Sequence, residues 1–360
     1  MNAVPIPVAI LTGFLGAGKT TLLNTLLKDP FLTNAAVIIN EFGDVGIDHL
    51  LVEKSDDNIV EMASGCLCCT IRGDLINTMY DLLARRNRGE IKSFDRIVIE
   101  TTGLADPAPV LHTLMSDDGL LRACRLEGVI TVVDAANGMA TLDAHAEAVK
   151  QVAVADRIVL TKVDLLSGRE GEDKLFAIIA RLRKLNLAAR LLTTHRNEAT
   201  AARLFTMSLY DPATKTVDVQ KWLAAEAYGK RHHHHHHDVS RHDDHIRSFS
   251  FTEKEPISPQ GLELFLELLK SYHGENMLRM KAIVKVADDP ARPVILHGVQ
   301  HVFHPPVRLE NWPDGDELTR LVFIVKDIDK AMIEGLFKAF TDQVTGGAAA
   351  FTDKTLSLNR

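Results

Sequence analysis

Short apolar runs alternate with longer amphipathic segments through the N-terminal half of the chain. Five mostly apolar or β-branched runs predict buried strands at 8–12, 35–40, 96–99, 128–133 and 157–160, and a shorter strand is predicted near 58–61. Helical spacing predicts helices at 20–28, 74–88, 107–115 and 138–152. Such alternation is typical of a mostly parallel sheet with helices on both faces. The pattern therefore predicts an α/β domain that extends to about Leu204.

The alternation ends near Thr206, and the remaining sequence has a different character. Strands are predicted at 247–251, 278–286, 293–303 and 318–325, and helices at 258–271 and 329–341. This pattern indicates a smaller α+β domain without a recognisable catalytic constellation. We predict the α/β domain at 1–210, a linker at 211–245, the C-terminal domain at 246–345 and a tail at 346–360.

The segment VAILTGFLGAGKTT, Val8–Thr21, carries the pattern G-x-x-x-x-G-K-T directly after the first predicted strand. This is the phosphate-binding P-loop, in which glycines let backbone N–H groups approach a phosphate and the next helix adds its positive dipole end. We expect Lys19 to contact the β- and γ-phosphate oxygens and the Thr20 hydroxyl to bind Mg²⁺. The predicted nucleotide ligands here are Gly13, Gly16, Ala17, Gly18, Lys19, Thr20 and Thr21.

An acidic loop follows the second predicted strand, where a nucleotide switch would carry its Mg²⁺-sensing segment. Its carboxylates are Glu41, Asp44 and Asp48, and they are separated by glycines. An ordinary acidic turn is the alternative interpretation.

The strand at 96–99 delivers Glu100 and Gly103 in the spacing E-x-x-G. A carboxylate at the end of a strand beside the P-loop is suited to the Mg²⁺ and phosphate site, and a glycine N–H can contact a γ-phosphate. The residues predicted to act in hydrolysis are Lys19, Thr20, Glu100 and Gly103.

The strand at 157–160 leads into Thr161-Lys162-Val163-Asp164. T-K-x-D is a variant of the N-K-x-D motif that selects guanine, because one carboxylate accepts from both guanine N1–H and N2–H₂ while the lysine stem stacks on the ring. A site built on such paired polar groups rejects adenine, which lacks the donor pair. A helix N-cap aspartate is the alternative for Asp164. We predict that Thr161, Lys162 and Asp164 recognise GTP.

Three cysteines, Cys66, Cys68 and Cys69, lie within the segment SGCLCCT. Thiolates are soft ligands that select Zn²⁺, Cu⁺ and similar ions, so we predict a transition-metal site. Its remaining ligand must come from elsewhere, with Glu41, Asp44 or a histidine as candidates. A redox pair and packing cysteines are the alternatives. Cys124 stands alone and is expected in the core.

Composition narrows the class of protein. With 360 residues, 46% of them hydrophobic, the chain can form two cores, and a net charge of −7 argues against nucleic acid or anionic membrane as partners. No apolar run approaches the ~20 residues that span a bilayer.

The apolar N-terminal run lacks a basic segment and leads into the P-loop, so we interpret it as a core strand rather than a signal peptide. Four cysteines, three of them within one tetrapeptide, are not a disulfide framework, and we therefore expect a cytoplasmic protein.

Six consecutive histidines occupy 232–237, and further His and Asp residues follow up to His245. An expression tag is one interpretation, but the internal position favours a native His-rich linker. Such a linker would hold divalent metal weakly.

Taken together, GFLGAGKTT, INEFGDVGID, SGCLCCT, ETTGLADP and TKVD resemble the CobW family of P-loop GTPase metallochaperones in order and spacing. The C-terminal segments LRMKAIV, LHGVQHVF and RLVFIV resemble the second domain of that family, although Ala282 and Val325 replace family glycines. The resemblance implies that the three cysteines are the metal motif, that Gly13–Thr21 and Thr161–Asp164 bind GTP, and that Mg²⁺ is held with Thr20.

The activity implied by the resemblance is a slow GTPase that delivers a transition metal, zinc first and cobalt next, to a client metalloprotein. Two other functions stay open. One is a metal store or sensor with structural GTP, and the other is cobalt insertion for cobalamin synthesis. A homo-oligomer is compatible with all of them.

Overall fold

The computed structural model describes residues 4–42, 59–64, 68–195, 198–205, 245–313 and 316–341; at 40–42, 59–64 and 68–74 it describes the backbone alone. These residues divide into two compact units. One is drawn from residues 1–183 and 189–208, and the other from 184–188 and 209–360. In the described part of the chain, no helix is long and apolar enough to cross a membrane.

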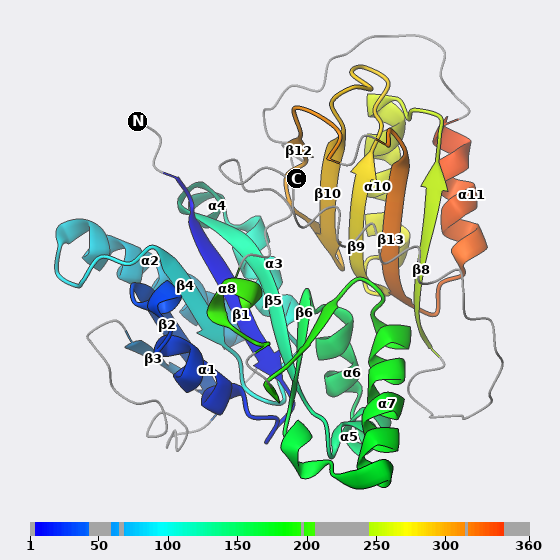
Figure 1. Cartoon of the computed structure of the whole chain (residues 1–360). Coiled ribbons are helices and arrows are strands. Elements are labelled where there is room, and N and C mark those ends of the chain that lie inside the picture. The colour runs from blue at the N-terminus through cyan, green and yellow to red at the C-terminus, as the bar shows by residue number, and fades with distance from the viewer. Residues whose placement is uncertain are drawn as a thin grey trace. The chain divides into compact units, whose positions relative to one another are not determined.

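The N-terminal unit is built on a parallel sheet (Figure 1). Its strands are β1 (Ile6–Gly13), β2 (Ala35–Phe42), β3 (Ile59–Ser64), β4 (Arg96–Glu100), β5 (Cys124–Asp134), β6 (Arg157–Thr161) and β7 (Arg190–Thr193). Seven described strands follow the order β3-β2-β4-β1-β5-β6-β7, and every pairing among them is parallel. The predicted α/β class is confirmed.

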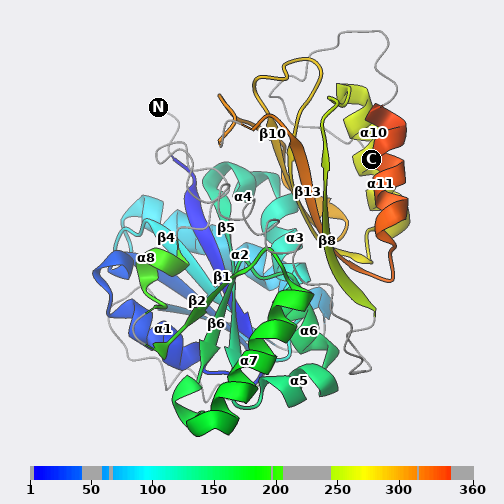
Figure 2. The same ribbon diagram turned by 45° about the vertical axis from the view of Figure 1, so that its right-hand side comes forward.

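Helices cover both faces of this sheet (Figure 2). They are α1 (Lys19–Leu27), α2 (Cys68–Arg88), α3 (Ala108–Ser116), α4 (Asp118–Ala123), α5 (Gly138–Ala144), α6 (Ala146–Ala153), α7 (Gly168–Leu185) and α8 (Ala201–Leu204), with short 3-10 turns η1 (Pro30–Leu32) and η3 (Val163–Leu165). Leu22, Leu23 and Leu26 of α1 pack against strand residues such as Leu11 and Val132, all at most 5% exposed. Burial of these apolar side chains is the main favourable term for the unit.

The parallel sheet places the carboxyl ends of its strands along one edge. In the order β3, β2, β4, β1, β5 and β6, the strands end at the segment before the cysteine motif, near Glu41, at Glu100, at the P-loop, at Asp134 and at Thr161. Ligand sites of open α/β sheets form outside the carboxyl ends of the strands. The sheet topology therefore brings the separate sequence motifs to one edge.

Two predicted helices differ from the structure. The helix predicted at 74–88 begins earlier, at Cys68. The helix predicted at 138–152 is divided into α5 and α6, because His145 takes an extended backbone and its ring stacks on Phe14 at 4.3 Å. A tertiary contact with the P-loop thus interrupts a helical sequence pattern.

The C-terminal unit is an antiparallel sheet with two helices, which confirms the predicted α+β class. Its elements are β8 (Ile246–Glu253), β9 (Met277–Val284), β10 (Val294–Val299), β11 (Val302–Phe303), β12 (Val307–Arg308), β13 (Thr319–Lys326), α10 (Pro259–His273) and α11 (Lys330–Thr341). The strand order is β11-β10-β9-β13-β8, and β12 also pairs with β10. The strand predicted at 293–303 is a hairpin, because Gln300 turns the chain with a φ of 51°.

Aromatic residues fill the core of this unit. Phe265 of α10 and Phe337 of α11 meet edge to face with ring centroids 5.0 Å apart, and Phe251 of β8 contacts Phe337. Ala282 and Val325, the two departures from the family pattern, are fully buried in the same core. Each replacement therefore adds a side chain to this buried core where the family pattern has a glycine.

Candidate functional site

The P-loop connects β1 to α1 and turns tightly against β5. Gly13 has a φ of 145°, and a Cβ at this position would lie 2.3 Å from the carbonyl oxygen of Val132. Only glycine fits so close to the neighbouring strand. The Ala17 N–H then donates to the Phe14 carbonyl, at 3.1 Å, and α1 begins at Lys19. The strand, turn and helix expected from the motif are present.

Lys19 is 9% exposed, and its Nζ donates to the carbonyl oxygen of Phe14 at 3.4 Å. The ammonium group therefore spans the same loop whose backbone N–H groups would face a phosphate. A cation held at the N-terminus of a helix strengthens an anion site. The arrangement suits the β- and γ-phosphates of a nucleotide.

The hydroxyl of Thr20 donates to Glu100 Oε1 at 2.8 Å, so the start of α1 and the end of β4 meet. Glu100 is 5% exposed. Hydroxyl and carboxylate oxygens are the ligands that Mg²⁺ prefers. This donor set fits Mg²⁺.

Gly103 lies directly against the P-loop. A Cβ on Gly103 would lie 2.6 Å from the backbone nitrogen of Leu15, so a side chain here would displace one loop from the other. Gln151 of α6 holds the same loop from the other side: its Nε2 donates to the carbonyl oxygens of Gly103 at 3.2 Å and Ala105 at 3.0 Å. Gln151 is 1% exposed. The E-x-x-G loop is therefore held between the P-loop and α6.

The T-K-x-D motif is joined to the P-loop through Thr161. The Thr161 hydroxyl lies 2.6 Å from the Ala17 carbonyl and 3.2 Å from that of Val133. Asp164 lies inside η3, whose N-cap is Lys162, so the alternative of an N-cap aspartate is wrong. The Asp164 side chain is exposed at the sheet edge, where a base could reach it.

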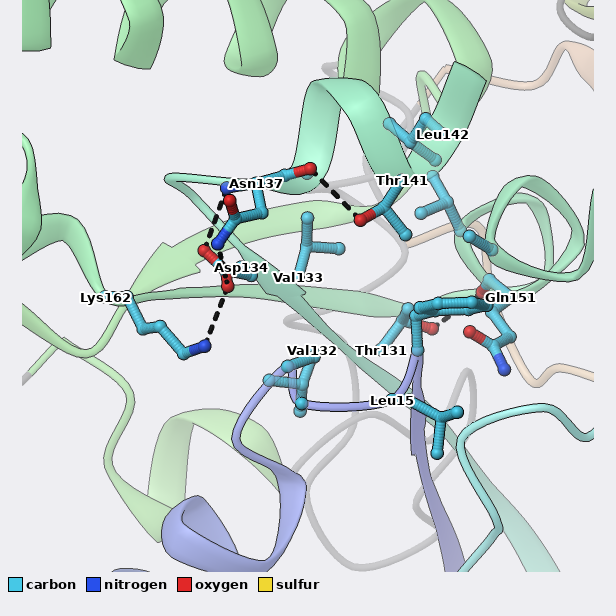
Figure 3. Close-up of a pocket in the computed structure, with 16 residues that line it drawn as sticks. Leu15, Thr131, Val132, Val133, Asp134, Asn137, Thr141, Leu142, Gln151 and Lys162 are labelled. Carbon is cyan, nitrogen blue, oxygen red and sulfur yellow. Dashed lines mark hydrogen bonds and ion pairs between the residues drawn. The ribbon is translucent and has the colours of Figure 1, made fainter. Parts of the chain in front are cut away.

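Lys162 has a left-handed backbone, with a φ of 55°, and its Nζ lies 2.8 Å from Asp134 Oδ2 (Figure 3). Burial raises the pKa of Asp134, but hydrogen bonds from Asn137 and Lys162 outweigh that effect and lower it below the usual range. Both residues line a cavity of about 220 Å³ beside the P-loop, between β5 and the helices α5 and α6. Asp134 and Gln151 were not predicted as site residues, although an aspartate that ends a buried strand beside the P-loop strand is a usable signal.

The predicted metal ligands lie largely outside the described residues. Asp44, Asp48 and Cys66 are not described; Cys68 and Cys69 are the first residues of α2, and Glu41 is near the end of β2, each described by backbone only. Among the side chains that the structure does describe, none form a cluster of three or more metal-binding residues. The metal site stays a prediction.

Comparison with known proteins identifies the two units. The profile of the CobW/HypB/UreG nucleotide-binding domain matches residues 7–191, and that of the cobalamin synthesis protein CobW C-terminal domain matches residues 246–341. The zinc chaperone YjiA of Escherichia coli is 31% identical over 92% of this chain and 98% of its own length. The zinc chaperone CobW of Pseudomonas aeruginosa is 32% identical over 91% of this chain and 89% of its own length.

Comparison with solved structures supports the same family. The crystal structure of the Zn(II)-bound YjiA GTPase from E. coli superposes with a TM-score of 0.67 at 28% identity, covering 94% of this chain and 99% of that one. The family resemblance drawn from the motifs is therefore confirmed. The chain belongs to the CobW/HypB/UreG family of P-loop GTPases and carries the CobW C-terminal domain.

Proposed function

We propose that this protein is a GTP-hydrolysing metallochaperone that binds zinc at Cys66, Cys68 and Cys69 in a nucleotide-dependent way and transfers it to a client metalloprotein. Cobalt is the next candidate metal. The similarity to zinc chaperones along nearly the whole chain supports zinc as the cargo. We place this activity in the cytoplasm, without nucleic acid or membrane as a partner.

The strand order is the observation that carries the proposal. β3, which precedes the cysteine segment, is separated from β1 by β2 and β4. Three inter-strand steps of roughly 4.8 Å give about 14 Å between the strand before the cysteines and the P-loop strand. The two intervening strands lead to Glu41 and Glu100. Metal and nucleotide motifs are thus connected through the residues proposed to respond to Mg²⁺ and the γ-phosphate.

The phosphate chemistry follows from the donor set. Lys19 would neutralise the β- and γ-phosphate oxygens, and Gly13, Gly16, Ala17, Gly18 and Thr21 would line the phosphate with backbone N–H groups. Thr20, with Glu100 beside it, would hold Mg²⁺, which stabilises the charge that develops during phosphoryl transfer. Gly103 would offer its N–H to the γ-phosphate, and Asp164 would select guanine.

The cysteine segment stands between the acidic loop and the E-x-x-G loop in the sequence, so we propose that both loops set its conformation. With GTP and Mg²⁺ the thiolates would converge on the metal, with Glu41 or Asp44 as an oxygen ligand; after hydrolysis they would separate. Asp48 would belong to the same Mg²⁺-sensing loop. Linkage makes the effect reciprocal, so a metal that binds more tightly with GTP must tighten GTP by the same factor.

A metal titration tests this mechanism. Zn²⁺ and Co²⁺ affinities should be measured by competition with a chromogenic chelator in the GTP–Mg²⁺, GDP and nucleotide-free states. A coupling of ~1–3 kcal/mol predicts a 5- to 150-fold difference between the GTP and GDP states. The Cys68→Ser variant should lose the tight site yet still bind GTP, while Cys124→Ala should keep both.

Equal affinities in all three states would contradict the switch and leave the alternative of a metal store or sensor with structural GTP. Tighter binding of Co²⁺ than Zn²⁺ under matched buffering would instead favour cobalt insertion.

A further inference from the structure

Asp134 ends β5 and is held by four hydrogen bonds. Its Oδ1 accepts from the backbone N–H groups of Ala136 at 2.8 Å and Asn137 at 3.0 Å. Its Oδ2 accepts from the Asn137 side-chain amide at 3.0 Å and from Lys162 Nζ at 2.8 Å. Figure 3 shows this carboxylate between Asn137 and Lys162. At 9% exposure, it is a fixed acceptor at the mouth of the turn between β5 and α5.

Lys162 needs such an anchor more than an ordinary surface lysine does. Its backbone is left-handed, which a side chain with a Cβ disfavours, and its flexible stem has many rotamers in water. The side chain is 37% exposed, so solvent alone would not hold it in one position. The neighbouring strand ends are rigid, because Asp134 and Thr161 are register partners of β5 and β6 and the Ala135 N–H donates to the Thr161 carbonyl at 3.0 Å.

We propose that Asp134 is a positioning residue for the nucleotide base: it holds the Lys162 ammonium so that the methylene stem forms a preorganised wall for guanine. This inference rests on the proposed binding of guanine nucleotides through Asp164. The ion pair removes rotamers of Lys162 before the nucleotide arrives, so less ordering is required on binding. Among the described residues, Asp134 forms its hydrogen bonds with Ala136, Asn137 and Lys162, which lie outside the P-loop, so we expect the effect to fall on binding rather than on chemistry.

Asp134 could instead have a purely structural role as the cap of the β5–α5 turn. In that case nucleotide binding would depend on its contacts with the turn and not on its contact with Lys162. The Asp134→Asn variant separates the two, because the amide oxygen still accepts from the N–H groups of Ala136 and Asn137. Its amide nitrogen can accept neither from Lys162 nor from the side-chain amide of Asn137, so the two backbone contacts alone hold the turn. The variant therefore keeps the turn and loses the anchor.

The experiment measures GDP and ADP affinities by isothermal titration calorimetry for the full chain and its variants. We expect Asp134→Asn to weaken GDP binding about 5- to 20-fold, because the Lys162 side chain must then be ordered when the nucleotide binds. The KM for GTP should rise by the same factor, with kcat within about twofold and the thermal midpoint within about 2 °C, since the turn is kept. A matched control is Asp143→Asn, which breaks the ion pair of that residue with Arg181 at 2.7 Å and should leave GDP affinity unchanged.

A double-mutant cycle gives the second readout. Lys162→Met keeps an apolar stem and removes the ammonium, so Asp134→Asn should cause no further loss of GDP affinity in that background. A full additional loss would show that Asp134 acts through the turn and would overturn the inference, as would GDP affinity of Asp134→Asn equal to the wild type. A wild type that binds ADP as well as GDP would instead overturn the guanine assignment itself.

Discussion

The Thr20 hydroxyl and the Glu100 carboxylate are joined by a hydrogen bond of 2.8 Å, across eighty residues of sequence. This contact connects the first turn of the P-loop helix to the end of β4. It places the residue expected to bind Mg²⁺ against the carboxylate expected to act with it. The pair is therefore the first target for mutation.

Glu100→Gln should reduce the GTP hydrolysis rate about 100-fold, because a neutral amide stabilises Mg²⁺ and the attacking water far less than a carboxylate does. GDP binding measured with EDTA present should change by less than about threefold, since the phosphate loop itself is intact. Steady-state phosphate release gives the rate. The control is Glu147→Gln, an exposed carboxylate on α6 that should have no effect. Unchanged hydrolysis in Glu100→Gln would remove Glu100 from the proposed mechanism.

Asp164→Asn should weaken GDP by about 100-fold or more, because the carboxylate that pairs two guanine donors is lost. The same variant should gain affinity for xanthosine diphosphate, since the asparagine amide can donate to the oxygen that replaces the guanine amino group. Competition binding against a fluorescent nucleotide measures both. Asp173→Asn, an exposed aspartate on α7, is the control. A nucleotide preference identical to the wild type would contradict base recognition by Asp164.

Gln151→Leu should destabilise the protein by about 1–3 kcal/mol, because it leaves the carbonyl groups of Gly103, which is buried, and Ala105, which is partly buried, without their shared donor. Hydrolysis should fall as well, since the E-x-x-G loop loses its attachment to α6. Urea unfolding and phosphate release measure the two effects. Asp106→Asn, which weakens the neighbouring ion pair with Lys150, should cost less than about 1 kcal/mol. Equal losses in the two variants would argue against a special role for Gln151.

The four cysteine thiols should fall into two groups that differ in their reactivity toward thiol reagents. Cys124 is 5% exposed, and burial raises the pKa of its thiol to about 11, so it is neutral near pH 8 and hidden from reagents. Since the folded-state pKa lies above the ordinary value of 9.0, folding disfavours the thiolate, and this residue reduces stability only as the pH rises past 9. Thiol titration of the native protein at pH 8 should count three reactive cysteines, and the fourth only after denaturation. Excess Zn²⁺ should protect those three; reaction of all four without denaturant would contradict the assignment.

The sequence predicts the fold class and the nucleotide motifs because these depend on local patterns. The glycines before Lys19 and the apolar runs before Glu100 and Thr161 are short-range signals with a direct physical reason. Asp134 and Gln151 were missed because their roles depend on partners from other strands and loops, Lys162 and Gly103, that only the folded sheet brings near. The break at His145 was missed for the same reason, since it follows from stacking on Phe14.

The position of β3 in the sheet has a kinetic consequence. Among the described strands β3 pairs only with β2, whereas β1 pairs with both β4 and β5. Opening β3 breaks hydrogen bonds to one neighbour, and segments held by fewer contacts open at lower free energy. The strand that leads to the cysteines can therefore open and close while the P-loop strand stays paired. Metal exchange by opening of β3 then needs no unpairing of the strand that leads to the P-loop, and amide hydrogen exchange should be faster in β3 than in β1.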